Sequence, residues 1–80
     1  MGACSRTVRL PGGYTYTVRT ARVPHTCSRC RKSIAPGEVY VEERPFRSPP
    51  RRYHIRCFSA ELGHRVRVDV VGDEVCLSVG

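Results

Sequence analysis

Two short pairs of cysteine and histidine constrain this chain more than any other feature of its sequence. Two residues separate Cys27 from Cys30, and two residues separate His54 from Cys57. A tight turn can place the first pair on one ion, and the second pair can reach the same point because positions i and i+3 of a helix share a face. The segment 31–53 is long enough for a strand and a return loop. Cysteine and histidine at these spacings are typical of a closed tetrahedral zinc site, so we expect one zinc ion held by these four residues.

Other donors leave an alternative ligand set open. His25 or Cys76 can replace a member of the set, for example Cys76 in place of His54. The alternation in the C-terminal part instead favours an exposed or edge thiol for Cys76, and we expect Cys4 in a mobile N-terminal segment. A redox role for the first cysteine pair is disfavoured because the chain lacks a βαβ pattern.

The size of the chain explains why it needs a cross-link. Its 80 residues suffice for one domain, and hydrophobic residues make up only 40% of them. A core this small rarely contributes more than about 3–5 kcal/mol to stability, so such domains usually contain a metal or disulfides. The N-terminus has no apolar signal region, no stretch is long enough to cross a membrane, and the five cysteines are an odd number. We therefore expect an intracellular, cytoplasmic protein with reduced thiols.

Hydrophobic periodicity divides the single domain, residues 1–80, into three parts. Residues 6–22 alternate apolar and polar side chains around a Pro-Gly-Gly turn, which predicts an N-terminal hairpin. Residues 24–62 contain the four metal-ligand candidates and form the predicted zinc finger. Residues 65–79 alternate around a Gly-Asp turn and predict a C-terminal hairpin.

Within the predicted finger, alternation over residues 38–43 indicates a strand. Residues 44–53 contain three prolines and are predicted to be an exposed loop. Residues 54–62 fit a short helix that ends at a C-capping Gly63. The sequence therefore predicts a small zinc-stabilised β-rich α+β domain with two β-hairpins, a zinc knuckle, a strand and one short helix.

Nothing in the sequence indicates an enzyme. Four protein ligands close a zinc site, whereas catalytic zinc keeps an open position. Glu42 and Glu43 are neighbours in the predicted strand and therefore point to opposite faces, so they are a poor carboxylate pair.

The finger region resembles the poly(ADP-ribose) polymerase-type zinc finger over about residues 25–62. The resemblance consists of Cys27-x₂-Cys30, a Pro-Gly-Glu turn and a strand, then an aromatic residue directly before His54 and a phenylalanine directly after Cys57. It implies a zinc-bridged sheet and helix with the same four ligands, and recognition of DNA breaks through phosphate contacts and base stacking. Phe46 stands roughly where that family has a base-stacking residue. The region is also similar to the first half of a LIM domain, but no second cysteine module follows.

The charge of the chain suggests a binding partner. Lys and Arg number 14 against 7 Asp and Glu, which gives a formal charge of +7, and all the basic residues except Lys32 are arginines. Guanidinium groups match phosphate oxygens, although a GC-rich genome also produces arginine bias. The candidate nucleic-acid contacts are Arg29, Arg31, Lys32, Arg44, Phe46, Arg47, Arg51, Arg52 and Arg56.

The alternative function is a protein-interaction adaptor that uses the zinc knuckle and exposed strand edges. One continuous positive face would favour nucleic acid as the partner. Arginines dispersed around an apolar patch would favour a protein.

Overall fold

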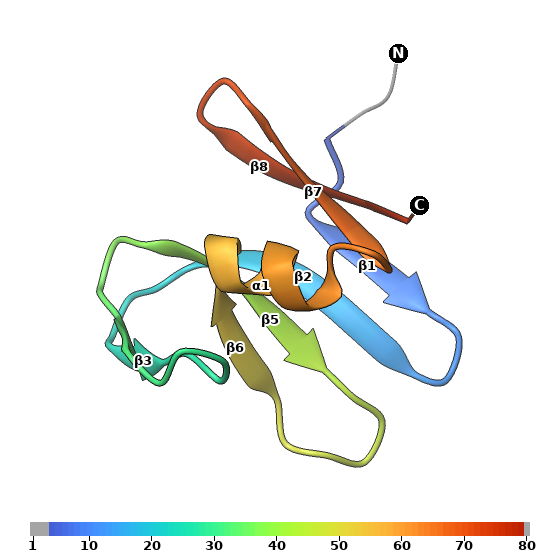
Figure 1. The fold of residues 1–80 in the computed structure, drawn as a ribbon, viewed down its shortest axis with the longest axis horizontal. Helices are drawn as coiled ribbons and strands as arrows, with labels where there is room; N and C mark the ends of the chain where they lie inside the picture. The colour runs from blue at the N-terminus through green and yellow to red at the C-terminus, as the bar shows by residue number, and fades with distance from the viewer. Residues whose placement is uncertain (1–3, 80) are drawn as a thin grey trace.

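The computed structural model describes residues 4–79. Eight strands and one helix follow one another in this region (Figure 1). Their bounds are β1 (Thr7–Leu10), β2 (Tyr14–Thr20), β3 (His25–Thr26), β4 (Ser33–Ile34), β5 (Val39–Arg44), β6 (Arg51–His54), α1 (Ile55–Leu62), β7 (Val66–Val71) and β8 (Glu74–Val79). The predicted β-rich architecture of hairpins, a knuckle and one short helix is confirmed. No helix in the described part of the chain is long and apolar enough to cross a membrane.

A four-stranded antiparallel sheet in the order β1-β2-β5-β6 organises the molecule. The N-terminal hairpin β1-β2 contributes two of its strands, and the predicted finger region contributes the other two. The central pairing places Val18 opposite Val41, and Tyr16 opposite Glu43. The N-terminal hairpin and the finger region are therefore parts of one sheet, although the sequence pattern separates them.

The core lies on one face of this sheet, which we call the helix face. Helix α1 crosses this face, and the hairpin β7-β8 packs beside it (Figure 1). Phe58 of α1 is fully buried, and its ring centroid lies 5.5 Å from that of Tyr16 and 5.9 Å from that of Tyr53. Val66 and Leu77 complete the core from the C-terminal hairpin. Each hairpin thus buries part of the apolar side that its alternation predicts, whereas Val70 and Val79 of the C-terminal hairpin stay 66% and 56% exposed.

The proline-rich segment is only partly a loop. Arg51, Arg52 and Tyr53, predicted as loop, belong to β6 and pair with β5. The three prolines all precede them, within residues 45–50, where no ladder hydrogen bond is needed. A period-2 run of only four residues carried too weak a signal to reveal this strand.

The helix ends differ from the prediction in detail. His54 is the N-cap and last residue of β6, so the helix begins at Ile55. Gly63 is the C-cap, but its φ of −61° is right-handed and not the left-handed geometry of a capping glycine. Glycine fits this position because a Cβ there would collide with the carbonyl oxygen of Ser59.

The expectations for Cys4 and Cys76 are wrong. The two residues form a disulfide that spans 72 positions, and Cys76 is buried with 8% exposure. Beside the disulfide, the Leu77 amide donates a 2.7 Å hydrogen bond to the carbonyl of Ser5. The N-terminal segment therefore runs along β8 instead of standing free. Sequence alternation marked Cys76 as outward-facing but could not show that another segment covers it.

The buried pair of Tyr16 and Glu43 predicts a stability that depends on alkaline pH. The Tyr16 hydroxyl donates a 2.8 Å hydrogen bond to Oε2 of Glu43. Burial, and then this carboxylate, raise the pKa of Tyr16 well above its ordinary value of about 10. Above about pH 10 the folded protein keeps the Tyr16 proton that the unfolded chain releases. The contribution of this group to the free energy of unfolding is therefore fully present below about pH 10 and is lost as the pH rises above it. We expect the free energy of unfolding to fall by about 1.4 kcal/mol per pH unit from this group.

Denaturant titrations between pH 9 and 11.5 measure this slope. Tyr16→Phe is expected to reduce this slope by about 1.4 kcal/mol per pH unit, which is the contribution of one proton. Tyr14→Phe, at an exposed strand position, is the matched control and should leave the slope unchanged. Equal slopes for Tyr16→Phe and the parent protein would contradict the interpretation.

Candidate metal centre

The first cysteine pair lies in a knuckle between the short strands β3 and β4. The Cys27 amide donates to the carbonyl of Lys32 over 2.9 Å, and the Arg31 amide donates to the carbonyl of Cys27 over 3.0 Å. Arg31 has a φ of +67°, which closes the turn in the left-handed region. The Ser28 amide donates to the carbonyl of Arg52 over 2.7 Å and attaches the knuckle to β6.

The second pair lies where β6 passes into α1. His54 is opposite Tyr40 in the β5-β6 ladder, and Cys57 occupies the first turn of the helix. The backbone amide of His54 reaches Sγ of Cys27 at 3.5 Å. Sheet pairing and the helix start thus bring together two pairs that lie far apart in the sequence.

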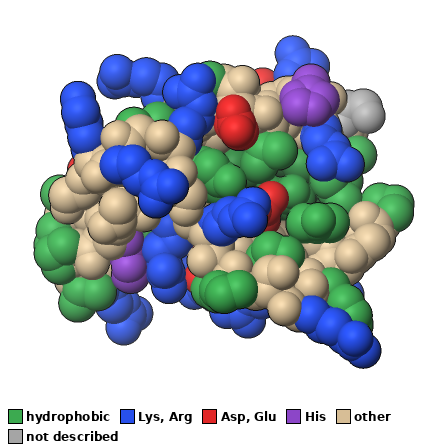
Figure 2. All heavy atoms as spheres, turned by 60° about the horizontal axis from the view of Figure 1, so that its bottom comes forward, with side chains coloured by type: hydrophobic (Ala, Val, Ile, Leu, Met, Phe, Trp, Pro, Cys, Tyr) green, Lys and Arg blue, Asp and Glu red, His purple; other side chains and the backbone are tan. Residues whose placement is uncertain are grey.

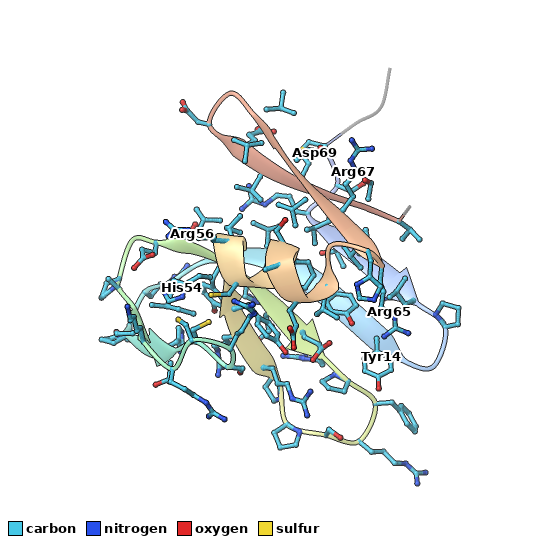
Figure 3. The ribbon with its side chains drawn as sticks, viewed as in Figure 1. Tyr14, His54, Arg56, Arg65, Arg67 and Asp69 are labelled. Carbon is cyan, nitrogen blue, oxygen red and sulfur yellow. A yellow bond between two sulfur atoms is a disulfide. The ribbon has the colours of Figure 1, made fainter. Side chains whose placement is uncertain are left out.

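One donor atom from each of Cys27, Cys30, His54 and Cys57 lies within 4.8 Å of the others. Sγ of Cys30 is 3.4 Å from Nδ1 of His54. A tetrahedral zinc ion with Zn–S bonds of about 2.3 Å and a Zn–N bond of about 2.0–2.1 Å requires an S···N separation of about 3.5 Å. The sulfur atoms beside the labelled His54 are visible in Figure 3. The four residues form a Cys₃His cluster that can hold a metal ion.

The histidine is oriented for this role by a hydrogen bond on its far side. Nε2 of His54 lies 3.1 Å from the carbonyl oxygen of Ser33, which can only accept a hydrogen bond. Nε2 therefore carries the proton, and Nδ1 presents its lone pair to the sulfurs. A backbone carbonyl that fixes the tautomer of a histidine in this way is typical of metal sites.

The surroundings shift the pKa values of the donors in different directions. Burial opposes ionisation of Cys27, but backbone amides of Cys30, His54 and Arg29 outweigh it and lower its pKa to about 6. Burial and the neighbouring cysteine sulfurs raise the pKa of Cys57. Burial works against protonation of His54, yet hydrogen bonds to Cys27 and the Ser33 carbonyl raise its pKa. The surroundings therefore favour the thiolate form of Cys27. A bound cation would also stabilise the thiolate forms of the other two cysteines of the cluster.

The other donors considered from the sequence lie elsewhere. Cys76 is bonded to Cys4, so it does not take part in the cluster. The ring of His25 packs against Tyr40, with the centroids 5.3 Å apart. Within residues 4–79, Cys27, Cys30 and Cys57 are the free cysteines, and all three belong to the cluster.

The predicted nucleic-acid contacts do not share one surface. Arg44 and Arg52 lie on the sheet face opposite the helix, which we call the open face, and approach the same carboxylate, Glu42. Arg51 lies on the helix face, 3.7 Å from Glu43. The alternation within β5 therefore sends Glu42 and Glu43 to opposite faces, as predicted.

The remaining candidates lie around the loop, the knuckle and the helix. Phe46 is 64% exposed at the loop, and the Arg47 guanidinium lies 5.1 Å from its ring centroid. Arg29 is 3.5 Å from a carboxylate oxygen of Glu61 on α1. Arg31 closes the knuckle turn, as described above. Lys32 and Arg56 line a cavity of about 810 Å³ beside the metal centre.

Sequence reasoning missed two arginines of the open face, Arg9 and Arg19. The ladder places Arg9 opposite Thr15, and Thr15 opposite Arg44. Nε of Arg19 lies 2.9 Å from Oε1 of Glu42. Alternation in the N-terminal hairpin predicted that both arginines lie on its polar side. The sequence could not show that they lie beside Arg44 and Arg52, because this depends on the long-range pairing of β2 with β5.

Comparisons with protein families, with curated proteins and with solved structures found no match for this chain. The fold and the Cys₃His cluster together indicate a small zinc-finger-like structural domain. The poly(ADP-ribose) polymerase-type pattern remains a resemblance in the residues of the finger region.

Proposed function

We propose that this protein is a structural zinc-finger domain that binds nucleic acid through the open face of its sheet. The observation that carries the proposal is the gathering of four arginines from four different strands on this face. They are Arg9 of β1, Arg19 of β2, Arg44 of β5 and Arg52 of β6. The cluster can hold zinc because three thiolates and an imidazole are its usual ligands, and four protein ligands favour a structural role over a catalytic one.

Glu42 is the carboxylate that contacts the arginines of this face among residues 4–79, and it balances only one of their four charges. Glu42 lies 2.9 Å from Arg19, 3.8 Å from Arg44 and 3.8 Å from Arg52. Four arginines and one glutamate give 4 − 1 = +3 for the face. Charges spread over a surface of this kind neutralise backbone phosphates and release counterions, whatever the base sequence.

The loop after β5 follows directly on Arg44, which lies on the open face. Phe46 is exposed and has a cation beside its ring. Aromatic stacking on an unpaired base contributes about 1–3 kcal/mol. A strand that crosses the open face would reach Phe46 at the loop, which supports single-stranded or broken DNA as the ligand, in keeping with the finger resemblance. We place this function in the cytoplasm, where the cluster's thiols stay reduced.

Fluorescence anisotropy with a single-stranded DNA oligonucleotide tests the proposal on the zinc-loaded protein. We expect Arg9→Gln/Arg44→Gln to lower affinity at least tenfold and to reduce the slope of log K against log salt by about 1.4, or 0.7 per lost phosphate contact. Arg65→Gln/Arg67→Gln is the matched control, since both residues lie on the C-terminal hairpin side (Figure 3), and it should change affinity less than threefold. Equal losses in the two double variants would show general attraction to a basic protein and contradict the assignment.

A protein-interaction adaptor is the second candidate, and a specific observation favours it. In the view of Figure 2, Lys and Arg side chains are spread around a hydrophobic patch and do not form one block. Tyr14 and Phe46 are exposed at 37% and 64%. The edge of β1 could in addition accept a partner strand. Recovery of one protein partner after nuclease treatment, together with no DNA affinity at low salt, would favour this function over the first.

A further inference from the structure

A second basic surface lies outside the metal centre and outside the contacts predicted from the sequence, and it meets the open face at Arg19. It is a groove of about 460 Å³ where β2 ends and the chain turns toward the knuckle. Arg6, Arg19 and Arg22 line it together with His25 and Tyr40. We call it the β2-end groove. Among the described residues, no Asp or Glu lines it, in contrast to the cavity beside the metal centre, which includes Glu38.

The charges of this groove are unbalanced. Arg19 is committed to Glu42, as described above. Arg6 and Arg22 have no carboxylate within 4.0 Å among the described residues. Arginines that line one groove without a counter-charge repel one another, and an anion bound between them adds an attraction to each.

The backbone around the groove is held in place. The Val18 amide donates to the carbonyl of Arg6 over 2.8 Å, which fixes one side. On the other side, Ala21 is buried, donates to the carbonyl of Glu38 over 2.8 Å and accepts a 2.8 Å bond from the Gly37 amide. Arg6 and the residue after Ala21, Arg22, therefore extend from fixed backbone positions. A site that exists before its ligand arrives loses less entropy on binding.

We propose that the β2-end groove binds a phosphate group. The guanidinium fork matches two phosphate oxygens at once, and a phosphate monoester has up to two negative charges for the two uncommitted arginines. The ring of His25, packed on Tyr40, adds polar atoms at the wall of the groove. The phosphate is carried either by a small phosphomonoester or by the end of a nucleic-acid strand. Only the second source rests on the function proposed above.

Titration of the zinc-loaded protein with inorganic phosphate, followed by amide NMR, tests the site. We expect saturable shifts confined to Arg6, residues 18–25 and Tyr40, with none when sodium chloride is added at matched ionic strength. Arg6→Gln/Arg22→Gln should weaken phosphate binding at least fivefold. The matched control, Arg65→Gln/Arg67→Gln, removes the same charge elsewhere and should stay within twofold of the parent. Shifts that do not saturate, or equal losses in both double variants, would overturn the proposal.

Two oligonucleotides that differ only in a 5′-phosphate distinguish the sources. If a strand end is the ligand, the phosphorylated oligonucleotide binds at least fivefold more tightly and Arg6→Gln/Arg22→Gln abolishes the difference. If a small phosphomonoester is the ligand, the two oligonucleotides bind alike while adenosine monophosphate competes with inorganic phosphate. Arg9→Gln/Arg44→Gln separates this proposal from the proposed function, because it should weaken DNA binding and leave inorganic phosphate binding unchanged.

Discussion

Removal of the metal is expected to unfold the finger region, residues 24–62. Zinc binding by small fingers is associated with about 10–16 kcal/mol at neutral pH, whereas a core of this size contributes about 3–5 kcal/mol. The cluster connects the knuckle to the junction of β6 and α1, beside the backbone hydrogen bond from Ser28 to Arg52 and the packing of Ile34 in the core. Without the ion, burial and mutual repulsion both oppose the thiolate forms of Cys27 and Cys57, because no cation balances their charge.

Amide NMR before and after addition of a strong chelator measures this effect. Resonances of residues 24–62 should collapse to the narrow range of an unfolded chain and return when zinc is added. Cys30→Ala should behave like the stripped protein even in excess zinc. Ser33→Ala is the matched control in the same knuckle, because it keeps all four donors and the carbonyl that orients His54. A dispersed, unchanged spectrum after verified metal loss would show that the metal is not structural.

Loss of the disulfide is expected to lower the free energy of unfolding by about 4 kcal/mol, because a closed loop of this length restricts the conformational entropy of the unfolded chain. The bond between Cys4 and Cys76 spans 72 positions, so it restricts nearly the whole unfolded chain. It also holds the N-terminal segment beside β8, where Ser5 accepts the amide of Leu77. Its loss should therefore loosen the β7-β8 hairpin first and leave the metal centre intact.

Denaturant unfolding and hydrogen exchange of Cys4→Ser in excess zinc measure this loss. The variant should unfold at a lower denaturant concentration, and amides of β7 and β8 should exchange faster while those of the knuckle do not. Ser5→Ala keeps the disulfide and the backbone acceptor and is the matched control. An unchanged unfolding midpoint for Cys4→Ser would contradict a stabilising disulfide.

The two cross-links differ in their dependence on redox conditions. A reducing cytoplasm opens disulfides, whereas a bound metal protects its thiolates. In that compartment the metal centre would be the remaining cross-link among the described residues. The fold would then retain the finger region and lose part of the anchoring of the C-terminal hairpin.

Local patterns in the sequence predicted most of the elements. The alternation of apolar residues gave both hairpins and the strand before the loop, because side chains in a strand point alternately to two faces. The spacing of the cysteines and His54 gave the candidate cluster, because a turn and a helix start each fix the separation of their own pair. The short strand β6 escaped prediction because its pairing partner, and not its own sequence, makes it a strand.

By itself, the sequence determined the two ligand pairs, Cys27 with Cys30 and His54 with Cys57, and the two hairpins, since each pair and each hairpin depends on residues close together along the chain. Only the tertiary structure decided which distant segments meet. The pairing of β2 with β5 placed Arg9 and Arg19 beside Arg44 and Arg52, and the packing of the N-terminal segment on β8 joined Cys4 to Cys76. Local sequence cannot specify such contacts, because they depend on strand register and on the closure of long loops.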